Sequence, residues 1–242
     1  MVTWNNLDKL ASYQELKDTA RVNLAEVMSG ENGAARVKNY SIPMAAGFTY
    51  NYAAKAVDDK VLAALVKLAD EAQLADKFKE LYNGAVINTG ENRLVLHQLT
   101  RGQLGDAVKA DGVDKRAFYV EQQNRIADFA NKVHAGEITN AAGEKFTTVV
   151  QIGIGGSDLG PRAMYLALEN WAKKNNTFKM EAKFISNVDP DDAAAVLNSI
   201  DVAHSIFVLV SKSGTTLETL TNESFVKDAL KNAGLNPSNH MI

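Results

Sequence analysis

The sequence predicts an α/β protein in which a parallel sheet flanked by helices follows a mostly helical N-terminal region. Three short apolar runs, rich in β-branched residues and bounded by turn residues, predict the strands: 148–152, 183–185 and 206–210. Helix-patterned segments alternate with them, at about 161–174, 190–199 and 215–232. Such alternation is typical of βαβ units, in which helices cover both faces of a parallel sheet.

In the N-terminal region, apolar residues recur at helical spacing. One apolar stripe begins at Leu7, and a second runs over 61–69 behind two acids that favour a helix start. The second pattern continues to a predicted stop at 83–84, and a further helix is predicted from about 113 to 134. The stretches between these helices, at 40–44 and 47–52, are expected to be irregular or extended.

The expected domain boundary separates residues 1–112, the mostly helical region, from residues 113–242, the α/β domain. His240-Met241-Ile242 follow a loop-like stretch and are expected to open a fourth strand. A sheet that stops two or three residues into a strand would leave a poorly covered edge. We therefore expect this chain to be the N-terminal piece of a longer protein, truncated at that strand.

Composition narrows the possible functions. The 46% hydrophobic and 23% charged content and the net charge of −3 predict a soluble, cytoplasmic protein without long-range attraction to nucleic acid or to an anionic membrane. The absence of cysteine excludes disulfides, thiolate catalysis and cysteine-based zinc sites. No apolar run approaches the roughly 18 residues of a membrane span. We expect no metal, no cofactor, and neither a nucleic-acid nor a membrane partner.

A hydroxyl-rich loop follows the third predicted strand and consists of Ser211, Lys212, Ser213, Gly214, Thr215 and Thr216. In that position, backbone N–H groups lie at the positive end of a helix dipole, which suits an anion such as phosphate. The hydroxyls and Lys212 add donors, and Gly214 lets the backbone approach a ligand closely. The alternative is an ordinary turn whose hydroxyls only cap the helix, and this loop alone leaves both interpretations open.

A second loop, Gly153–Pro161, follows the first predicted strand and carries several glycines. A dinucleotide-binding fingerprint fails there, because Asp158 stands where the third glycine is required and no acid follows near residue 178. A Walker A motif also fails, because Pro161-Arg162 replaces its lysine and hydroxyl residue. Open α/β sheets bind ligands beyond the carboxyl ends of their strands, where both loops are expected. Their pairing favours a small phosphorylated ligand.

Four segments resemble the glucose-6-phosphate isomerase family, occur in the family's order and cover most of the chain: 89–97, 150–161, 186–189 and 211–219. A serine-rich phosphate loop alone would indicate only the wider class of sugar-isomerase (SIS) domains. The segment Gly-Ile-Gly-Gly-Ser-Asp-Leu-Gly-Pro at 153–161 is much more specific.

The resemblance implies a flavodoxin-like, doubly wound SIS sheet and a hexose 6-phosphate substrate. It implies interconversion of glucose 6-phosphate and fructose 6-phosphate, in glycolysis and gluconeogenesis, by a full-length homodimer. It assigns sugar contacts to Gly156 and Ser157. It assigns phosphate binding to Ser211, Lys212, Ser213, Gly214, Thr215 and Thr216. A phosphate dianion beside Lys212 would keep this lysine protonated, so it is not a Schiff-base candidate.

No catalytic residue is expected within this chain. In the family, the glutamate base and its assisting histidine and lysine lie in the later half, so they are expected beyond Ile242. Glu218 is read as a helix-start residue. The four histidines are read as core or surface residues: His97, His134, His204 and His240.

Three interpretations of the chain remain open. In the first, it is the phosphosugar-binding part of the isomerase and is inactive alone. In the second, it is a non-catalytic SIS module that senses a phosphosugar and regulates a partner. In the third, it belongs to an isomerase of another sugar phosphate, which only substrate assays can distinguish. Glu91, Asn92, Arg93 and His97 match a family segment without an obvious chemical role. They are read as structural support, with Glu91 and Arg93 as a buried ion pair.

Overall fold

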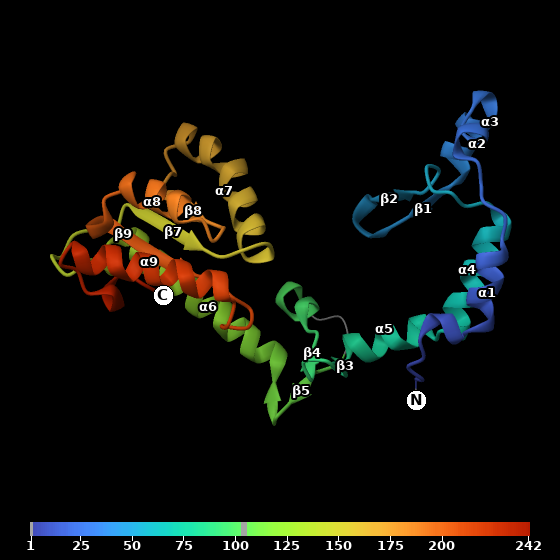
Figure 1. Cartoon of the computed structure of the whole chain (residues 1–242), viewed down its shortest axis with the longest axis horizontal. Coiled ribbons are helices and arrows are strands. Elements are labelled where there is room, and N and C mark those ends of the chain that lie inside the picture. The colour runs from blue at the N-terminus through green and yellow to red at the C-terminus, as the bar shows by residue number, and fades with distance from the viewer. Residues whose placement is uncertain (1, 103–105) are drawn as a thin grey trace. The chain divides into compact units, whose positions relative to one another are not determined.

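The structure, a computed structural model, describes residues 2–102 and 106–242. It contains two compact units, Met1–Val120 and Glu121–Ile242 (Figure 1). The division falls inside helix α6 (Lys115–Ala135), to which both units contribute residues. The domain boundary expected between residues 112 and 113 stays a prediction.

The first unit consists mainly of helices joined by short hairpins, as the sequence predicts. Its helices are α1 (Ala11–Asp18), α2 (Leu24–Val27), α3 (Gly30–Asn39), α4 (Asp59–Glu71) and α5 (Leu74–Tyr82). Its antiparallel strand pairs are β1 (Ser41–Pro43) with β2 (Thr49–Asn51), β3 (Val86–Asn88) with β4 (Arg93–Leu94), and β5 (Lys109–Ala110) with β6 (Val113–Asp114). The first pair lies within the stretches that were expected to be irregular or extended.

Helices α4 and α5 form where one apolar pattern runs without interruption. The Asp58 side chain caps α4 by accepting a hydrogen bond from the Val61 N–H at 2.8 Å, and α5 ends at Tyr82, next to the predicted stop. Gln73 separates the two helices, with a left-handed backbone φ of 54°. Its side-chain oxygen accepts a hydrogen bond from the Thr3 N–H at 2.7 Å. Because Thr3 and Gln73 are distant in the sequence, no local sequence pattern indicates this contact.

A buried arginine organises the other end of the first unit. The guanidinium of Arg36, in α3, donates to the backbone carbonyls of Ala53, Lys55 and Val57 at 2.8, 3.0 and 2.6 Å. It also lies 4.0 Å from the centroid of the Tyr40 ring. Arg36 therefore holds α3 against the segment that follows β2.

The second unit is built on a three-stranded parallel sheet, which confirms the predicted fold class. The strands β7 (Thr148–Ile152), β8 (Glu181–Ile185) and β9 (Ser205–Leu209) stand in the order β8-β7-β9. Helices α7 (Gly156–Lys174), α8 (Pro190–Asn198) and α9 (Leu217–Asn232) follow them in turn. Met241 makes a parallel bridge to Phe207 on the outer side of β9, at the position of the expected fourth strand.

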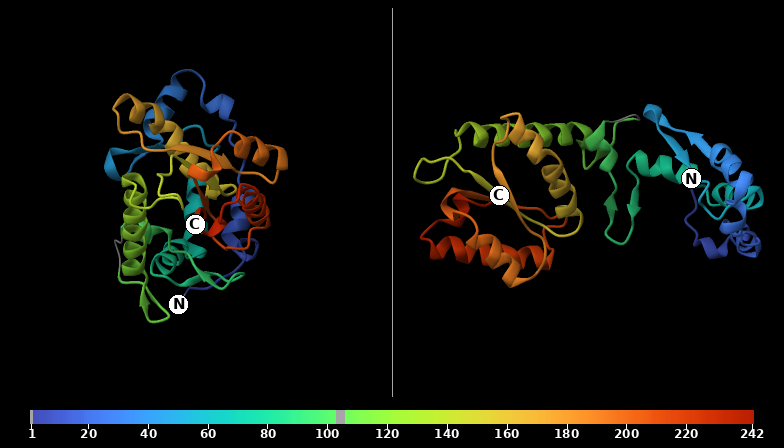
Figure 2. Two further views of the ribbon diagram at one scale, coloured as in Figure 1. Left: turned by 90° about the vertical axis from the view of Figure 1, so that its left-hand side faces the viewer. Right: turned by 90° about the horizontal axis from the view of Figure 1, so that it is seen from above.

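The side chains of alternate strand residues point to opposite faces of this sheet. Helices α8 and α9 cover one face, where the buried core includes Val150, Ile152 and Phe207. Helix α6 packs on the other face, against Val149 and Ile206. Figure 2 shows α6 and α9 on opposite sides of the sheet. Since β7 is central, the chain winds outward from it in both directions, and the strand order reverses between β7 and β9.

Candidate functional site

The two loops singled out in the sequence start from neighbouring strand ends at this reversal point. The N–H of Val210, just after β9, donates to the carbonyl of Ile152, the last residue of β7, at 2.8 Å. The N–H of Gly153 reaches the Ile185 carbonyl of β8 at 3.3 Å. A Cβ atom at Gly153 would lie 2.8 Å from the Ser157 carbonyl oxygen and 3.1 Å from that of Val210. Gly153 is therefore required for the two loop bases to pack together.

The loop from Ser211 to Thr216 is folded on itself by its own hydroxyls. The Oγ of Ser211 pairs with the Oγ1 of Thr216 at 3.0 Å and accepts a hydrogen bond from the Gly214 N–H at 3.1 Å. The Oγ of Ser213 accepts from the N–H and the hydroxyl of Thr215, at 3.1 and 3.0 Å. Gly214 has a φ of 71°, a conformation that glycine adopts without strain. The result is a closed turn with Lys212 exposed on it.

Thr216 is the N-cap residue of α9, yet its hydroxyl does not cap the helix. It bonds Ser211 instead, and the backbone bond from the Leu220 N–H to the Thr216 carbonyl is 3.1 Å long. The N–H groups of residues 217–219 therefore lie at the positive end of a 16-residue helix, beyond the reach of an intrahelical acceptor. This arrangement departs from the capping interpretation, because it leaves the start of α9 without a side-chain cap. Glu218 lies in this first turn, as expected of a helix-start residue.

The glycine loop enters α7 earlier than the sequence predicts. The helix begins at Gly156 rather than near Pro161, and Gly155 precedes it with a φ of 56°. Gly156 and Ser157 therefore lie in the first turn of α7, and Pro161 lies in the second. The expected start was wrong because proline favours the first helical position, whereas here it stands inside the helix.

A side chain of β7 replaces the hydrogen bond that this proline removes. Pro161 has no N–H to offer the carbonyl of Ser157, which stands four residues before it. The Nε2 of Gln151 donates to that carbonyl at 2.7 Å. Gln151 thus ties the first turn of α7 to the end of the central strand. Sequence reasoning missed this residue, because a helix that began at Pro161 would need no donor in place of the proline N–H.

Asp158, which breaks the dinucleotide fingerprint, has a structural role. Its buried carboxylate accepts two hydrogen bonds from Arg162, from Nε at 3.1 Å and from Nη2 at 3.0 Å. The Arg162 guanidinium lies 4.7 Å from the centroid of the Phe184 ring of β8. The pair therefore fixes the start of α7 over the sheet. It also accounts for Asp158 and Arg162, two of the three residues that rule out the nucleotide motifs.

The family segment 89–97 differs from its prediction. Glu91 and Arg93 are both exposed, so the expected buried ion pair is wrong. The Glu91 carboxylate accepts a hydrogen bond from the Asn88 side chain at 3.1 Å, within the tight connection between β3 and β4. His97 is exposed at the start of a short 3₁₀ helix, His97–Arg101. This segment belongs to the first unit.

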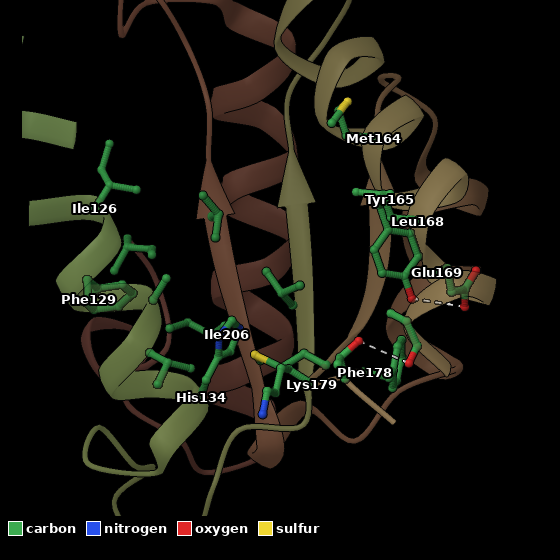
Figure 3. A pocket seen from close by; sticks show the side chains of 18 residues that line it. Ile126, Phe129, His134, Met164, Tyr165, Leu168, Glu169, Phe178, Lys179 and Ile206 are labelled. Carbon is green, nitrogen blue, oxygen red and sulfur yellow. Dashed lines mark hydrogen bonds between the residues drawn. The ribbon is translucent and has the colours of Figure 1, made fainter. Parts of the chain in front are cut away.

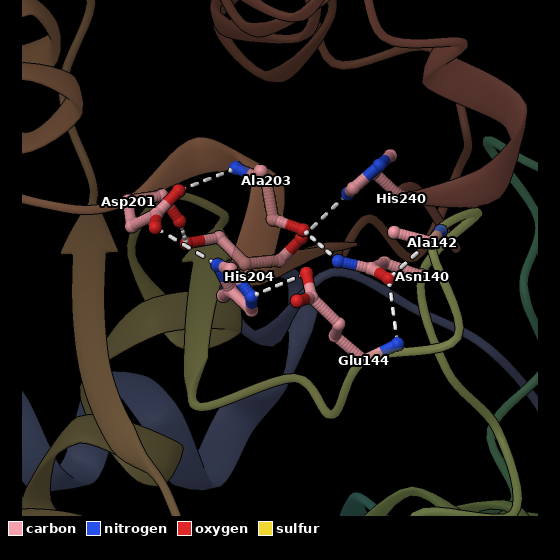
Figure 4. A network of polar contacts seen from close by, with 8 residues as sticks. Asn140, Ala142, Glu144, Asp201, Ala203, His204 and His240 are labelled. Carbon is pink, nitrogen blue, oxygen red and sulfur yellow. Dashed lines mark hydrogen bonds and ion pairs between the residues drawn. The ribbon is translucent and has the colours of Figure 1, made fainter.

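His204 holds a polar network at the amino end of β9, at the opposite end of the strand from the loops (Figure 4). Its ring nitrogens contact Asp201 at 2.8 Å and Glu144 at 3.0 Å. The hydrogen bond with Asp201, supported by Glu144, raises the pKa of His204 and lowers the pKa of the Asp201 carboxyl. Asn140 donates to the Ala203 carbonyl at 3.0 Å, which joins the same two segments. The network ties the turn before β7 to the start of β9.

The remaining histidines and pocket lie apart from the two loops. His240 is buried beneath Phe146 and contacts the Ser205 carbonyl at 2.9 Å, and His134 is exposed on α6. A pocket of about 520 Å³ opens on the α6 and α7 side of the sheet (Figure 3).

Among the described residues, no cluster of three His, Asp or Glu side chains could hold a metal ion. In the same part of the chain, no helix is long and apolar enough to cross a membrane.

The fold and the paired loops define a doubly wound α/β domain with a candidate ligand site at its switch point. Comparison with known proteins gives the family. The chain belongs to the phosphoglucose isomerase family, whose model matches residues 51–242.

Individual relatives agree with this assignment. A glucose-6-phosphate isomerase of Treponema denticola is 55% identical over 99% of this chain, and one of Borreliella afzelii is 43% identical over 97%. The crystal structure of a glucose-6-phosphate isomerase from Chlamydia trachomatis superposes on 98% of the chain with a TM-score of 0.75 and 34% identity. The chain spans 46%, 44% and 44% of the length of these three proteins, which is a little under half of each.

Proposed function

We propose that this chain is the phosphosugar-binding half of an enzyme that interconverts glucose 6-phosphate and fructose 6-phosphate in glycolysis and gluconeogenesis. The enzyme would act in the cytoplasm as a homodimer. Membership of the phosphoglucose isomerase family supports the reaction. The single observation that carries the binding role is the closed turn at 211–216, in which Thr216 bonds Ser211 and leaves the start of α9 without a side-chain cap.

In this proposal the turn holds the 6-phosphate of the substrate. The helix dipole, the N–H groups of residues 217–219 and the ammonium of Lys212 all favour a dianion. The hydroxyls of Ser211, Ser213, Thr215 and Thr216 exchange their mutual hydrogen bonds for bonds to phosphate oxygens. These hydroxyls are already held together in the turn, so phosphate binding requires little reorganisation of the loop.

Gly156 and Ser157 are proposed to contact the sugar. They lie in the first turn of α7, and the Gly153 packing contact connects the bases of the two loops. A phosphate held at one loop and a sugar at the other would position the reacting carbons C1 and C2. Binding energy from the non-reacting phosphate would then support positioning of the carbons that react.

The reaction needs a base that carries a proton between C1 and C2, and acid–base help to open the sugar ring. We assign neither role to a residue of this chain and expect both in the part of the enzyme that lies outside it. Glu218 remains a helix-start residue in this proposal. The chain alone is therefore expected to bind hexose 6-phosphates weakly and not to turn them over. The alternative, a non-catalytic phosphosugar sensor, is not favoured, because the relatives described above are named as isomerases.

Calorimetric titration with glucose 6-phosphate, with glucose as the non-phosphorylated control, tests the proposal. The double substitution Ser211→Ala and Thr216→Ala should weaken phosphate-dependent binding roughly tenfold or more, because two donors are lost. Thr221→Ala is the matched control, because it removes a hydroxyl of α9 that bonds the Leu217 carbonyl of the same helix. Equal affinity of the double variant and the parent chain would refute the loop assignment. Robust isomerase activity of the pure chain would refute the absence of catalytic groups.

A further inference from the structure

An apolar groove lies on the sheet face opposite α8 and α9, between α6 and α7 (Figure 3). Its floor comes from β7 and β9, through Val149, Ile206 and Val208, and its volume is about 520 Å³. Ile126 of α6 and Met164 and Leu168 of α7 line its walls and are all exposed. Both faces of a parallel sheet are normally covered, so this face lacks part of its cover.

Two polar side chains that line the groove, those of Tyr165 and Glu169, are engaged with one another. The Tyr165 hydroxyl donates to the Glu169 carboxylate at 3.2 Å, and the Lys173 ammonium pairs with the same carboxylate at 2.7 Å. His134 and Lys179 also line the groove, but most of the lining side chains are apolar, so the surface presented to an occupant is mainly hydrocarbon. Contiguous exposed apolar surface of this kind marks an interaction site in a soluble protein.

The last two residues show that the groove continues along the sheet. Met241, which bridges to Phe207, packs against the core under α8 and α9, whereas Ile242 lines the groove. Neighbouring residues thus point to opposite faces, as in a strand. The sheet edge beside β9 therefore contributes to the groove floor.

We propose that this groove receives the apolar face of a helix from the polypeptide that makes up the other half of the full-length relatives. This chain matches 44–46% of their length, so more than half of each relative lies outside the match. A helix is the fitting occupant, because helices form both walls and helices normally cover a parallel sheet. The groove is an internal docking surface that joins the two halves. This inference goes beyond the proposed function and does not depend on phosphate binding.

The chain contains no cysteine, so one introduced cysteine can be labelled at a unique position. Leu168→Cys places an environment-sensitive fluorophore in the groove. Leu166→Cys is the matched control, because Leu166 lies on the same helix with 59% exposure, against 50% for Leu168, and does not line the groove. The titrant is the unmatched half of the Treponema denticola relative, produced as a separate polypeptide. We expect a saturable blue shift of the label at 168 and no comparable shift at 166.

A second pair of variants tests the same surface without a label. Leu168→Lys should weaken the complex roughly tenfold or more, because a charge would enter an apolar contact, whereas Leu166→Lys should change it less than about twofold. Both leucines are exposed, so both variants should keep the circular dichroism of the parent chain. Absence of a complex, or equal effects of the two lysines, would overturn the proposal. A blue shift that depends on the concentration of this chain alone would also overturn it, because a second copy would then fill the groove.

Discussion

Replacing Gln151 with methionine should loosen the start of α7, because no other group replaces its bond to the Ser157 carbonyl. Methionine keeps the length of the side chain and removes the donor that lies 2.7 Å from this oxygen. Pro161 cannot substitute, since it has no N–H. Leaving a partly buried carbonyl without a donor costs about 1–2 kcal/mol in the free energy of unfolding.

A second substitution makes the prediction specific. Pro161→Ala restores an N–H one helical turn after the Ser157 carbonyl, so it should offset the loss in the Gln151→Met background. In the parent background the restored N–H finds a carbonyl that already has a donor. The two substitutions should therefore show a coupling free energy of about 1 kcal/mol. Effects of Pro161 on the unfolded chain occur in both backgrounds and cancel in the cycle.

Hydrogen exchange in increasing urea, read from peptides of β7 and α7, measures this free energy within the second unit. Glucose 6-phosphate titration of the four proteins provides a second readout, since Ser157 is the proposed sugar contact. Gln151→Met should lower affinity, and Pro161→Ala should restore part of it. Additive effects of the two substitutions, or an unchanged α7 in Gln151→Met, would refute the role of Gln151.

Three further predictions concern other parts of the chain. The pKa of His204 is raised in the folded protein, so the stability that this histidine adds is present below its ordinary pKa and is lost as the pH rises through the raised value. The urea midpoint of the parent chain should therefore exceed that of His204→Gln by more at pH 6 than at pH 8.5. An equal difference at the two pH values would contradict the ion-pair network. Gly153→Ala should destabilise the second unit by about 1–3 kcal/mol, because the added Cβ would lie 2.8 Å from a backbone oxygen. Gly156→Ala is the control: its Cβ would have no atom within 4 Å, so this variant should melt near the temperature of the parent chain. Arg36→Met should lower the hydrogen-exchange protection of α3 by about 2–3 kcal/mol, because three backbone carbonyls lose a charged donor. Helix α9 serves as the internal control. Equal losses of protection in α3 and α9 would show that the effect is not local.

Sequence patterns located the sheet well, because buried parallel strands are short apolar runs between turn residues. All three predicted runs overlap β7, β8 and β9, and the loops that follow them start from hydrogen-bonded strand ends. Local chemistry also located the helix start at Asp58, where a carboxylate caps α4.

The features that the sequence did not predict depend on particular side-chain contacts, most of them between distant residues. The break at Gln73 accompanies a bond to Thr3, and the early start of α7 accompanies a bond from Gln151 around a proline. The network at His204 requires Glu144, 60 residues earlier in the chain. A periodic pattern cannot indicate such pairings, because it reports only which side of an element is apolar. The burial expected for Glu91 failed because the segment forms a tight surface connection.

The central position of β7 has a consequence for how the second unit is made on the ribosome. β7 leaves the ribosome first, and β8, β9 and the residues around Met241 follow in that order. Each new strand can add to an edge that already exists, and none has to insert between two earlier strands. The sheet can therefore grow during synthesis, and the loop after β7 is made before the turn at 211–216.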